Sequence, residues 1–141
     1  MILLDVNVLV HACRRDSERH AAYRDWLADA LSGDEPIGIY PETLASVVRI
    51  TTHARVWKQP ISVADALSFC EAVRTAPSAV VVQAGDNHWS IFTTLCSEAS
   101  VKGNLVMDAW LAAVAIGNGC TLVTTDTDFA RFRGLRWRMP V

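Results

Sequence analysis

The 141-residue sequence lacks the long hydrophobic segments that mark membrane and exported proteins. No apolar run approaches the roughly 20 residues that a helix needs to cross a bilayer. The N-terminus also lacks the charged leader and apolar segment of a signal peptide. We therefore expect a cytoplasmic protein.

Cysteine is scarce and scattered, which argues against two classes of small protein. The four cysteines form no C-x-x-C pair, and each lies among apolar neighbours: Cys13, Cys70, Cys96 and Cys120. Without a sign of export, they are typical of reduced core residues rather than of a disulfide framework or a zinc site. The four histidines likewise have no metal-ligand spacing.

Basic charge is not in excess. Thirteen Lys and Arg against 15 Asp and Glu leave a formal charge of −2, so no overall positive field attracts nucleic acid from a distance. Any binding of nucleic acid must therefore be local. No glycine-rich loop follows the first apolar run, which excludes a dinucleotide or P-loop site.

What the sequence does contain is an alternation of short apolar runs and amphipathic segments. Short apolar runs at residues 1–4, 37–40, 79–82 and 120–123 are typical of short buried strands, and residues 135–138 form a further strand-like segment. Apolar residues recur at helical spacing between them, with start and stop signals such as Gly33, Pro41 and Ser62. This pattern predicts a three-layer α/β/α sandwich around a central, mainly parallel sheet. The length predicts one domain spanning residues 1–141.

Acidic residues recur where the predicted strands end. Asp5 follows the first strand, Glu42 the second and Asp126 the fourth, while Asp108 opens the helix before the fourth strand. Ligands of parallel sheets bind at the carboxyl ends of strands, near the point where strand order reverses. We therefore expect these four acids to converge at one edge of the sheet.

Carboxylates held together in a partly dry cleft repel one another, so they take up protons or recruit a cation. Oxygen ligands alone favour Mg²⁺ or Mn²⁺ over zinc. Such ions activate water and stabilise the charge that develops on a phosphodiester, which predicts hydrolysis of a nucleic-acid backbone. Asn7 and Thr125 are candidates for orienting the ligands, although either is also a common turn former.

Each acid also has an ordinary structural interpretation. Asp108 in a first helical turn interacts favourably with the helix dipole, and Asp126 or Asp128 would suit the cap of the following turn. Asp5 is harder to explain in this way, because a charge directly after a buried strand needs a partner. No lysine or arginine lies near it in sequence.

Three segments together resemble the PIN-domain ribonucleases, and specifically the VapC toxins of VapBC toxin–antitoxin pairs. They read "MILLDVNVLV", "VVRITTHARVWKQPISVADAL" and "LVMDAWLAAVAIGNGCTLVTTDTDFARFRGLRW". The last is the most specific, because the acid, small-residue helix, glycine break, strand and T-x-D-x-D-F occur in the family's order and spacing.

The resemblance implies a PIN-like fold and Mg²⁺- or Mn²⁺-dependent cleavage of RNA. It further implies a cognate VapB-type antitoxin that blocks the site, and a homodimer. Asp5 matches the family's first acid, Asp108 its third and Asp126 its fourth, with Asp128 as an auxiliary. Asn7 and Thr125 match its usual supporting positions.

The second acid of the family has no direct counterpart. It commonly lies inside a helix just before a leucine, and one register places Ser46 there. Glu42 lies one turn earlier on the same helical face, from which its longer side chain would reach the ion. We therefore expect Glu42 to serve as the second acid.

Two other functional classes compete with this interpretation. One is a catalytically inactive PIN-fold module that binds RNA or a partner, although the full set of aspartates argues against it. The other is a phosphotransfer protein, which needs a lysine beside its acids; Lys58 and Lys102 are the only lysines. Trp57 is a candidate for stacking on a base or for anchoring its loop.

The arginines near the C-terminus are also open to two interpretations. They would suit phosphate contacts beside the site, and the alternation of Arg136 and Arg138 with apolar residues is equally typical of a solvated strand edge. The same two interpretations apply to Arg14, Arg15, Arg49 and Arg55.

Overall fold

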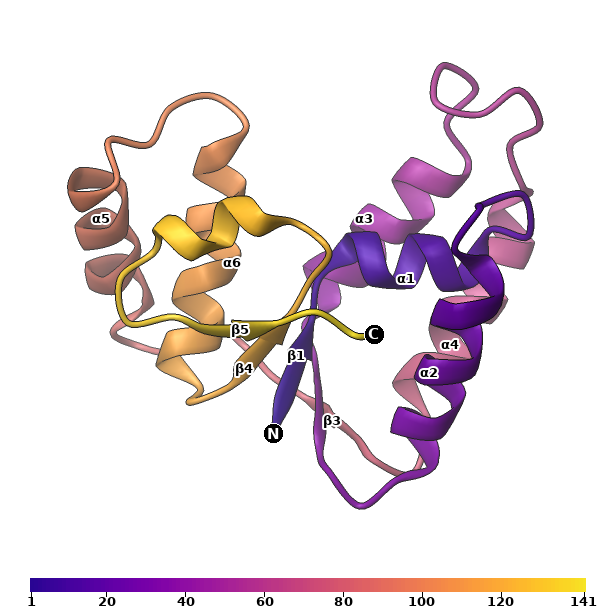
Figure 1. Ribbon diagram of the computed structural model, residues 1–141, viewed down its shortest axis with the longest axis horizontal. Helices are drawn as coiled ribbons and strands as arrows, with labels where there is room; N and C mark the ends of the chain where they lie inside the picture. The colour runs from indigo at the N-terminus through magenta and orange to yellow at the C-terminus, as the bar shows by residue number, and fades with distance from the viewer.

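The computed structural model describes residues 1–141 as a parallel sheet flanked by helices (Figure 1). The strands are β1 (Ile2–Leu4), β2 (Ile37–Ile39), β3 (Ala79–Val81), β4 (Thr121–Val123) and β5 (Arg136–Arg138). The helices are α1 (Val6–Cys13), α2 (His20–Ser32), α3 (Pro41–Thr51), α4 (Val63–Arg74), α5 (His88–Glu98), α6 (Leu105–Gly117) and the 3₁₀ helix η1 (Thr127–Arg131). All five predicted strands are confirmed.

The sheet has the strand order β3-β2-β1-β4-β5, and every neighbouring pair is parallel. The chain builds outward from β1 in one direction through β2 and β3, then returns to the other side of β1 as β4. Strand order therefore reverses between β1 and β4, which is where open parallel sheets form a ligand crevice at their carboxyl ends.

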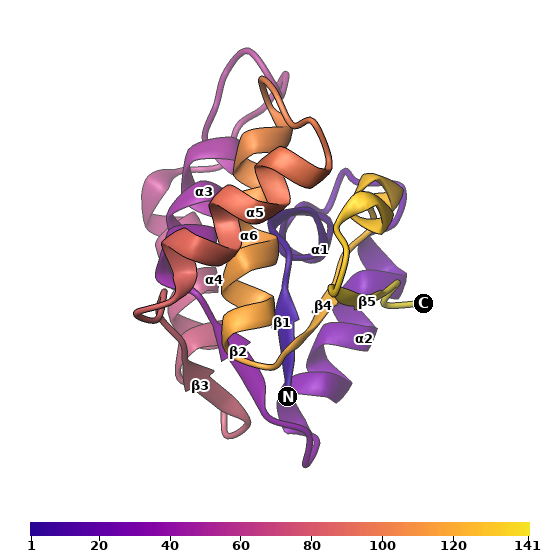
Figure 2. The ribbon, with the colours of Figure 1, turned by 90° about the vertical axis from the view of Figure 1, so that its left-hand side faces the viewer.

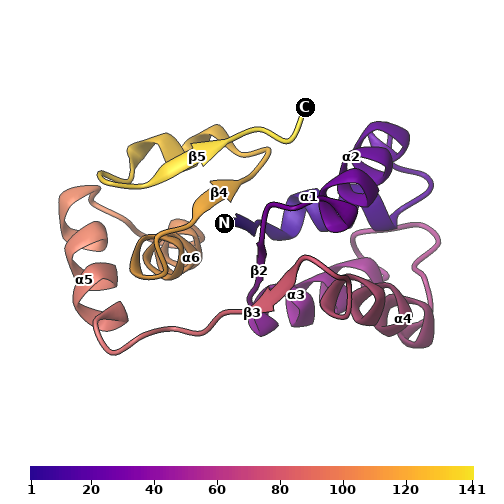
Figure 3. The same cartoon turned by 90° about the horizontal axis from the view of Figure 1, so that it is seen from below.

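Two hydrophobic cores cover the two faces of the sheet, as the three-layer prediction requires. Ile2 and Leu4 of β1 pack with side chains of α1, α2, α3 and α4, whereas Leu3 packs with α5, α6 and η1. Successive side chains of a strand point to opposite faces, so one short strand serves both cores. Figures 2 and 3 show α5 and α6 on one side of the sheet and α1 to α4 on the other.

Local sequence signals explain where several helices begin. The Ser62 hydroxyl accepts a hydrogen bond from the Asp65 amide at 3.0 Å, which caps α4 as predicted. Pro41 opens α3, where its missing N–H costs no helical hydrogen bond. Asn87 precedes α5, but its side chain makes no capping hydrogen bond. Gly119 ends the α6 turn with a φ of 65°, a conformation that favours glycine.

Trp57 anchors its loop. Its indole N–H donates to the Ile50 carbonyl at 3.1 Å, and the Arg14 guanidinium lies 4.2 Å from its ring centroid. Both the polar edge and one face of the ring are thus engaged within the protein. The loop-anchor interpretation holds, and Trp57 is not placed to stack on a base.

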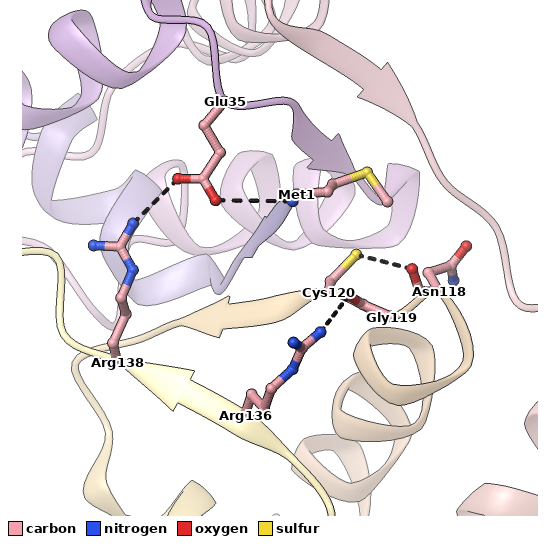
Figure 4. A network of polar contacts seen from close by, with 7 residues as sticks. All are labelled: Met1, Glu35, Asn118, Gly119, Cys120, Arg136 and Arg138. Carbon is pink, nitrogen blue, oxygen red and sulfur yellow. Dashed lines mark hydrogen bonds and ion pairs between the residues drawn. The ribbon is translucent and has the colours of Figure 1, made fainter.

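Arg136 and Arg138 of β5 contact residues that precede β2 and β4, at the amino ends of these strands (Figure 4). Glu35 lies 3.8 Å from the Met1 ammonium and 3.5 Å from Arg138, and Arg136 donates to the Gly119 carbonyl at 2.6 Å. Exposed ion pairs of this kind contribute about 0–1 kcal/mol. Arg136 and Arg138 are exposed on the strand edge, as their alternation predicts.

All four cysteines are free thiols; Cys70 and Cys120 are buried and Cys13 and Cys96 half-buried. None of the helices is long and apolar enough to span a membrane.

Candidate active site

Asp5 lies at the point where β1 ends and α1 begins. It is only 3% exposed, and its backbone N–H donates to the Val123 carbonyl at 3.0 Å, which extends the pairing of β1 with β4. One carboxylate oxygen accepts the Val6 amide at 2.7 Å, so Asp5 is also the N-cap of α1. Burial raises the pKa of this carboxyl group, and the hydrogen bonds from Thr124 and Val6 partly oppose the shift.

The partner that Asp5 needs comes from the end of β4. The Thr124 hydroxyl donates to Asp5 Oδ2 at 2.6 Å and accepts the Asp126 amide at 3.0 Å. One fully buried side chain therefore holds two predicted site acids. Asn7 also donates to Asp5 Oδ2, at a longer 3.4 Å, so the expected supporting role of Asn7 agrees with its position.

The hydroxyl that donates to Asp5 belongs to Thr124 and not to the predicted supporting residue, Thr125. The Thr125 side chain makes no hydrogen bond in the structure. The only signal for Thr124 was its position: it directly follows the buried strand, so its side chain continues the strand alternation. Two adjacent threonines at a strand end cannot be told apart by composition.

Asp108 lies in the first turn of α6 and belongs to the same electrostatic cluster. Burial raises its pKa from 3.8 to about 6, with further contributions from the negative charges of Asp5, Asp126 and Asp128. The structure thus brings together three acids that are distant in sequence, with Asp5 and Asp126 close enough to raise the pKa of Asp108. Arg131 is the cation that opposes this shift.

Asp126 and Asp128 also have the local roles that helix capping predicts. Asp126 Oδ1 accepts the Asp128 amide at 2.8 Å and caps η1. The exposed Asp128 carboxylate pairs with Arg131 at 2.9 Å. Asp128 is therefore already neutralised in part, which suits an auxiliary position better than a ligand.

Glu42 and Ser46 line the same cavity as Asp5 and Asp108. This cavity has a volume of about 220 Å³ and lies between α3, along its length from Glu42 to Ile50, and the start of α6. Glu42 is exposed there and is not among the charges that raise the Asp108 pKa. Of the three aspartates, Asp5 and Asp108 line this cavity and Asp126 does not, and neither lysine lines it.

A tyrosine and a tryptophan that the sequence reasoning did not assign to the site fix one cavity wall. The Trp110 indole N–H donates to the Tyr40 hydroxyl at 3.0 Å, and His88 Nε2 lies 3.1 Å from the Trp110 carbonyl oxygen. Tyr40 follows β2 and Trp110 comes two residues after Asp108. The hydrogen bond therefore ties the start of α6 to the end of β2 and positions Asp108.

The chemistry of the acids fits a hard divalent cation, because all candidate donors are carboxylate oxygens. A nearby cation would relieve the repulsion that raises the Asp108 pKa. The side chains lie within electrostatic range but not within ligation range, since no three acidic, histidine or cysteine side chains are grouped tightly enough to hold a metal ion. Joint ligation requires these side chains to turn toward the ion.

Comparison with known proteins agrees with this arrangement. The sequence profile of the PIN domain matches residues 2–135, and the chain belongs to this family. Ribonuclease VapC43 of Mycobacterium tuberculosis is 43% identical over 141 residues, covering 100% of this chain and 96% of that protein. Ribonuclease VapC31 of the same organism is 39% identical over 140 residues, covering 99% of each. Ribonucleases of the PIN-domain family generally depend on a divalent metal ion.

Two solved structures confirm the fold. VapBC2 from Rickettsia felis, bound to a DNA fragment from its promoter, gives a TM-score of 0.71 at 20% identity, covering 99% of this chain and 98% of that one. VapC20 from Mycobacterium tuberculosis, a sarcin-ricin loop cleaving toxin, gives 0.67 at 16% identity, with 96% and 99% covered. The predicted α/β/α sandwich with a parallel central sheet is therefore confirmed.

Proposed function

We propose that this chain, as a single PIN domain, is a metal-dependent endoribonuclease that acts as the toxin of a type II toxin–antitoxin pair in the cytoplasm. The observation that carries the proposal is the cluster of Asp5, Asp108 and Asp126, in which burial and the neighbouring negative charges raise the Asp108 pKa to about 6. Full-length similarity to VapC ribonucleases supports the same reaction class.

The ion is Mg²⁺, for which Mn²⁺ can substitute, and Asp5, Asp108 and Asp126 hold it. Glu42 is the candidate fourth ligand, Ser46 a supporting neighbour and Asp128 an auxiliary. When bound, such an ion activates water and stabilises the charge on a phosphodiester under attack. Thr124 keeps Asp5 oriented through the 2.6 Å hydrogen bond, and Asn7 supports the same oxygen.

The test is cleavage of total RNA by the wild type and by Asp5→Asn, each with Mg²⁺, with Mn²⁺ and with EDTA. We expect the wild type to cleave only with metal, and the variant to lose more than about 100-fold, beyond the loss typical of an outer ligand contact. Asp25→Asn is the matched control, because Asp25 is exposed on α2 and pairs only with Arg24. Equal cleavage by wild type and Asp5→Asn would reject the nuclease; RNA binding without cleavage by the wild type would favour the binding module.

The protein partner in this proposal is a VapB-type antitoxin that covers the site. The structural neighbour from Rickettsia felis is a VapBC assembly. A small reading frame beside this gene, whose product co-purifies with the chain and suppresses RNA cleavage, is the expected finding. A product that binds without suppressing cleavage contradicts the blocking role.

We also propose a homodimer. The strand β3 lies at the edge of the sheet, with Val80 46% and Val81 51% exposed, and Trp89 of the following helix is 65% exposed. Exposed apolar side chains along an unpaired strand edge are typical of an interaction surface. The mass in solution, measured by light scattering, tests this directly, and a monomer at high concentration contradicts it.

A further inference from the structure

Arg49 is the only basic residue that lines the cavity of the acids. The other eleven lining residues are acidic, neutral polar or apolar, and include Asp5 and Asp108. Arg49 projects from α3 and is exposed. Its guanidinium makes no ion pair and no side-chain hydrogen bond, unlike Arg14, Arg24, Arg74 and Arg131, each of which pairs with a carboxylate.

Arg49 shares the cavity with Asp5, Glu42 and Asp108. It forms an ion pair with none of these carboxylates. The cavity therefore combines a group of carboxylates with one unpaired positive charge.

An ordinary explanation accounts for only part of this arrangement. Arg49 lies in the last turn of α3, where a cation gains about 0.3–1 kcal/mol from the helix dipole. That placement explains a basic residue at the end of the helix. It does not explain why this residue also lines the cavity or why it has no acidic partner, although Glu42 lies two turns earlier on the same helix.

The carboxylates of the cavity repel the phosphates of an RNA strand, and the unpaired Arg49 would offset this repulsion. A bound divalent ion offsets the carboxylates locally, but an RNA strand also brings in the phosphates that flank the scissile one. Arginine suits such a group because its planar fork donates two parallel hydrogen bonds to phosphate oxygens. Met107 of α6 lines the same cavity, and its side chain, 65% exposed, offers apolar surface to a ribose or base.

We propose that Arg49 binds the phosphate adjacent to the one cleaved, so that the cavity holds one sugar–phosphate unit of the RNA between Arg49 and the aspartates. The proposal rests on the RNA-cleaving function proposed above. The volume of about 220 Å³ is below the range usual for drug-sized ligands, which limits the occupant to part of one nucleotide. Contacts to phosphate fix the position of a strand without reading its sequence.

The first test compares Arg49→Ala with the wild type on a synthetic single-stranded RNA that carries a cleavage site mapped by sequencing 5′ ends. We expect KM to rise by about tenfold, equivalent to 1.4 kcal/mol of binding, with kcat changed less than twofold and the cleavage site retained. The slope of log(1/KM) against log[NaCl] should fall by about 0.7, the value for one phosphate contact on a single strand. Arg49→Lys keeps the positive charge but not the planar guanidinium, and its KM should lie between those of the wild type and Arg49→Ala.

Arg24→Ala is the matched control, because Arg24 is an exposed helical arginine remote from the cavity and paired with Asp25. It should change neither KM nor the salt slope. A role confined to the helix dipole would lower the thermal stability of Arg49→Ala while leaving KM and the salt slope at wild-type values. That result would overturn the proposal.

The second test removes the charge from the RNA. A methylphosphonate on one side of the scissile phosphate should raise the KM of the wild type by about the same factor as Arg49→Ala, and should add nothing in that variant, since both changes remove one interaction. If the methylphosphonate raised KM as much in Arg49→Ala as in the wild type, whichever side of the scissile phosphate carried it, the contact between Arg49 and an adjacent phosphate would be ruled out. If the wild type does not cleave RNA at all, the proposed function fails; if it cleaves and Arg49→Ala is unaffected, only this inference fails.

Discussion

Thr124 and Asp5 are 119 positions apart in sequence and are joined by a 2.6 Å hydrogen bond between the threonine hydroxyl and the buried carboxylate. The contact crosses from the end of β4 to the end of β1, at the point where strand order reverses. Because the same hydroxyl accepts the Asp126 amide, the positions of two site acids depend on one side chain. The threonine is thus the structural link within the carboxylate cluster.

Replacement of Thr124 by valine should disturb both acids while keeping the side-chain shape. The variant leaves Asp5 without its strongest side-chain donor and the Asp126 amide without an acceptor. We expect a loss of about 1–3 kcal/mol in the free energy of unfolding, the cost of leaving a buried polar group unsatisfied. The pKa of Asp5 should rise further, because the lost hydrogen bond favours the charged form.

Urea unfolding at neutral pH measures the stability change, and Thr125→Val provides the control at the adjacent position. Because the Thr125 side chain makes no hydrogen bond, its replacement should change stability by less than about 0.5 kcal/mol. Equal losses in the two variants would show that the contact between Thr124 and Asp5 has no special energetic role.

The raised pKa of Asp108 predicts a pH-dependent stability in metal-free protein. The folded state binds this proton more tightly than the unfolded state, with a pKa of about 6 against 3.8. The contribution of Asp108 to the free energy of unfolding should therefore be greatest below pH 3.8 and should decline as the pH rises to about 6. The side chain introduced by Asp108→Asn cannot ionise, so this contribution should not change with pH in the variant.

We expect Asp108→Asn to be more stable than the wild type by about 1 kcal/mol at pH 7.5, after allowance for the half-exposed position of the group. The difference should disappear near pH 4. Thermal melts in EDTA at the two pH values measure it. Mg²⁺ should raise the melting temperature of the wild type more at pH 7.5 than at pH 5, since protons compete with the ion. A stability advantage that is equal at both pH values would contradict ionisation of the half-buried Asp108 carboxyl group as the cause.

Glu42→Gln should weaken metal use without abolishing cleavage. Glu42 lines the cavity but is exposed to solvent there, so its contribution to holding the ion should be smaller than that of the buried Asp5. We expect the Mg²⁺ concentration for half-maximal RNA cleavage to rise by about tenfold, at the lower end of the effect of outer ligand contacts. Cleavage at saturating Mg²⁺ should stay within a few-fold of wild type.

Glu98→Gln, on the exposed surface of α5, is the control for Glu42→Gln and should leave the Mg²⁺ dependence unchanged. A complete loss of cleavage in Glu42→Gln would instead make Glu42 a direct ligand equal to the aspartates. No change at all would leave the site with three acids.

Much of the fold follows from sequence because each of its signals is local. A run such as Ile2–Leu4 has no polar residue to expose, so it must lie inside a sheet covered on both faces. Parallel strands then place their carboxyl ends at one edge, which is why the order of strands and acids along the chain is enough to predict that Asp5 and Asp126 meet.

The details of the site could not be obtained in the same way, because they depend on contacts between residues far apart in sequence. A one-residue difference separates Thr124 from Thr125, and side-chain direction at the end of a short strand decides between them. The bond between Trp110 and Tyr40 spans 70 positions, and nothing near either residue indicates it. Arg49 resembles several other arginines in its sequence surroundings, and only its position in the cavity lining distinguishes it from them.

The central place of β1 has a consequence during synthesis on the ribosome. The first five residues provide the innermost strand and its terminal carboxylate, yet both neighbours of that strand are made later, and residues 124–126 come after nearly nine-tenths of the chain. A nascent polypeptide stopped before that point has no wall opposite Asp5 and no fourth acid. The acidic cluster therefore cannot form in a growing chain until residues 124–126 have been made and β4 has paired with β1.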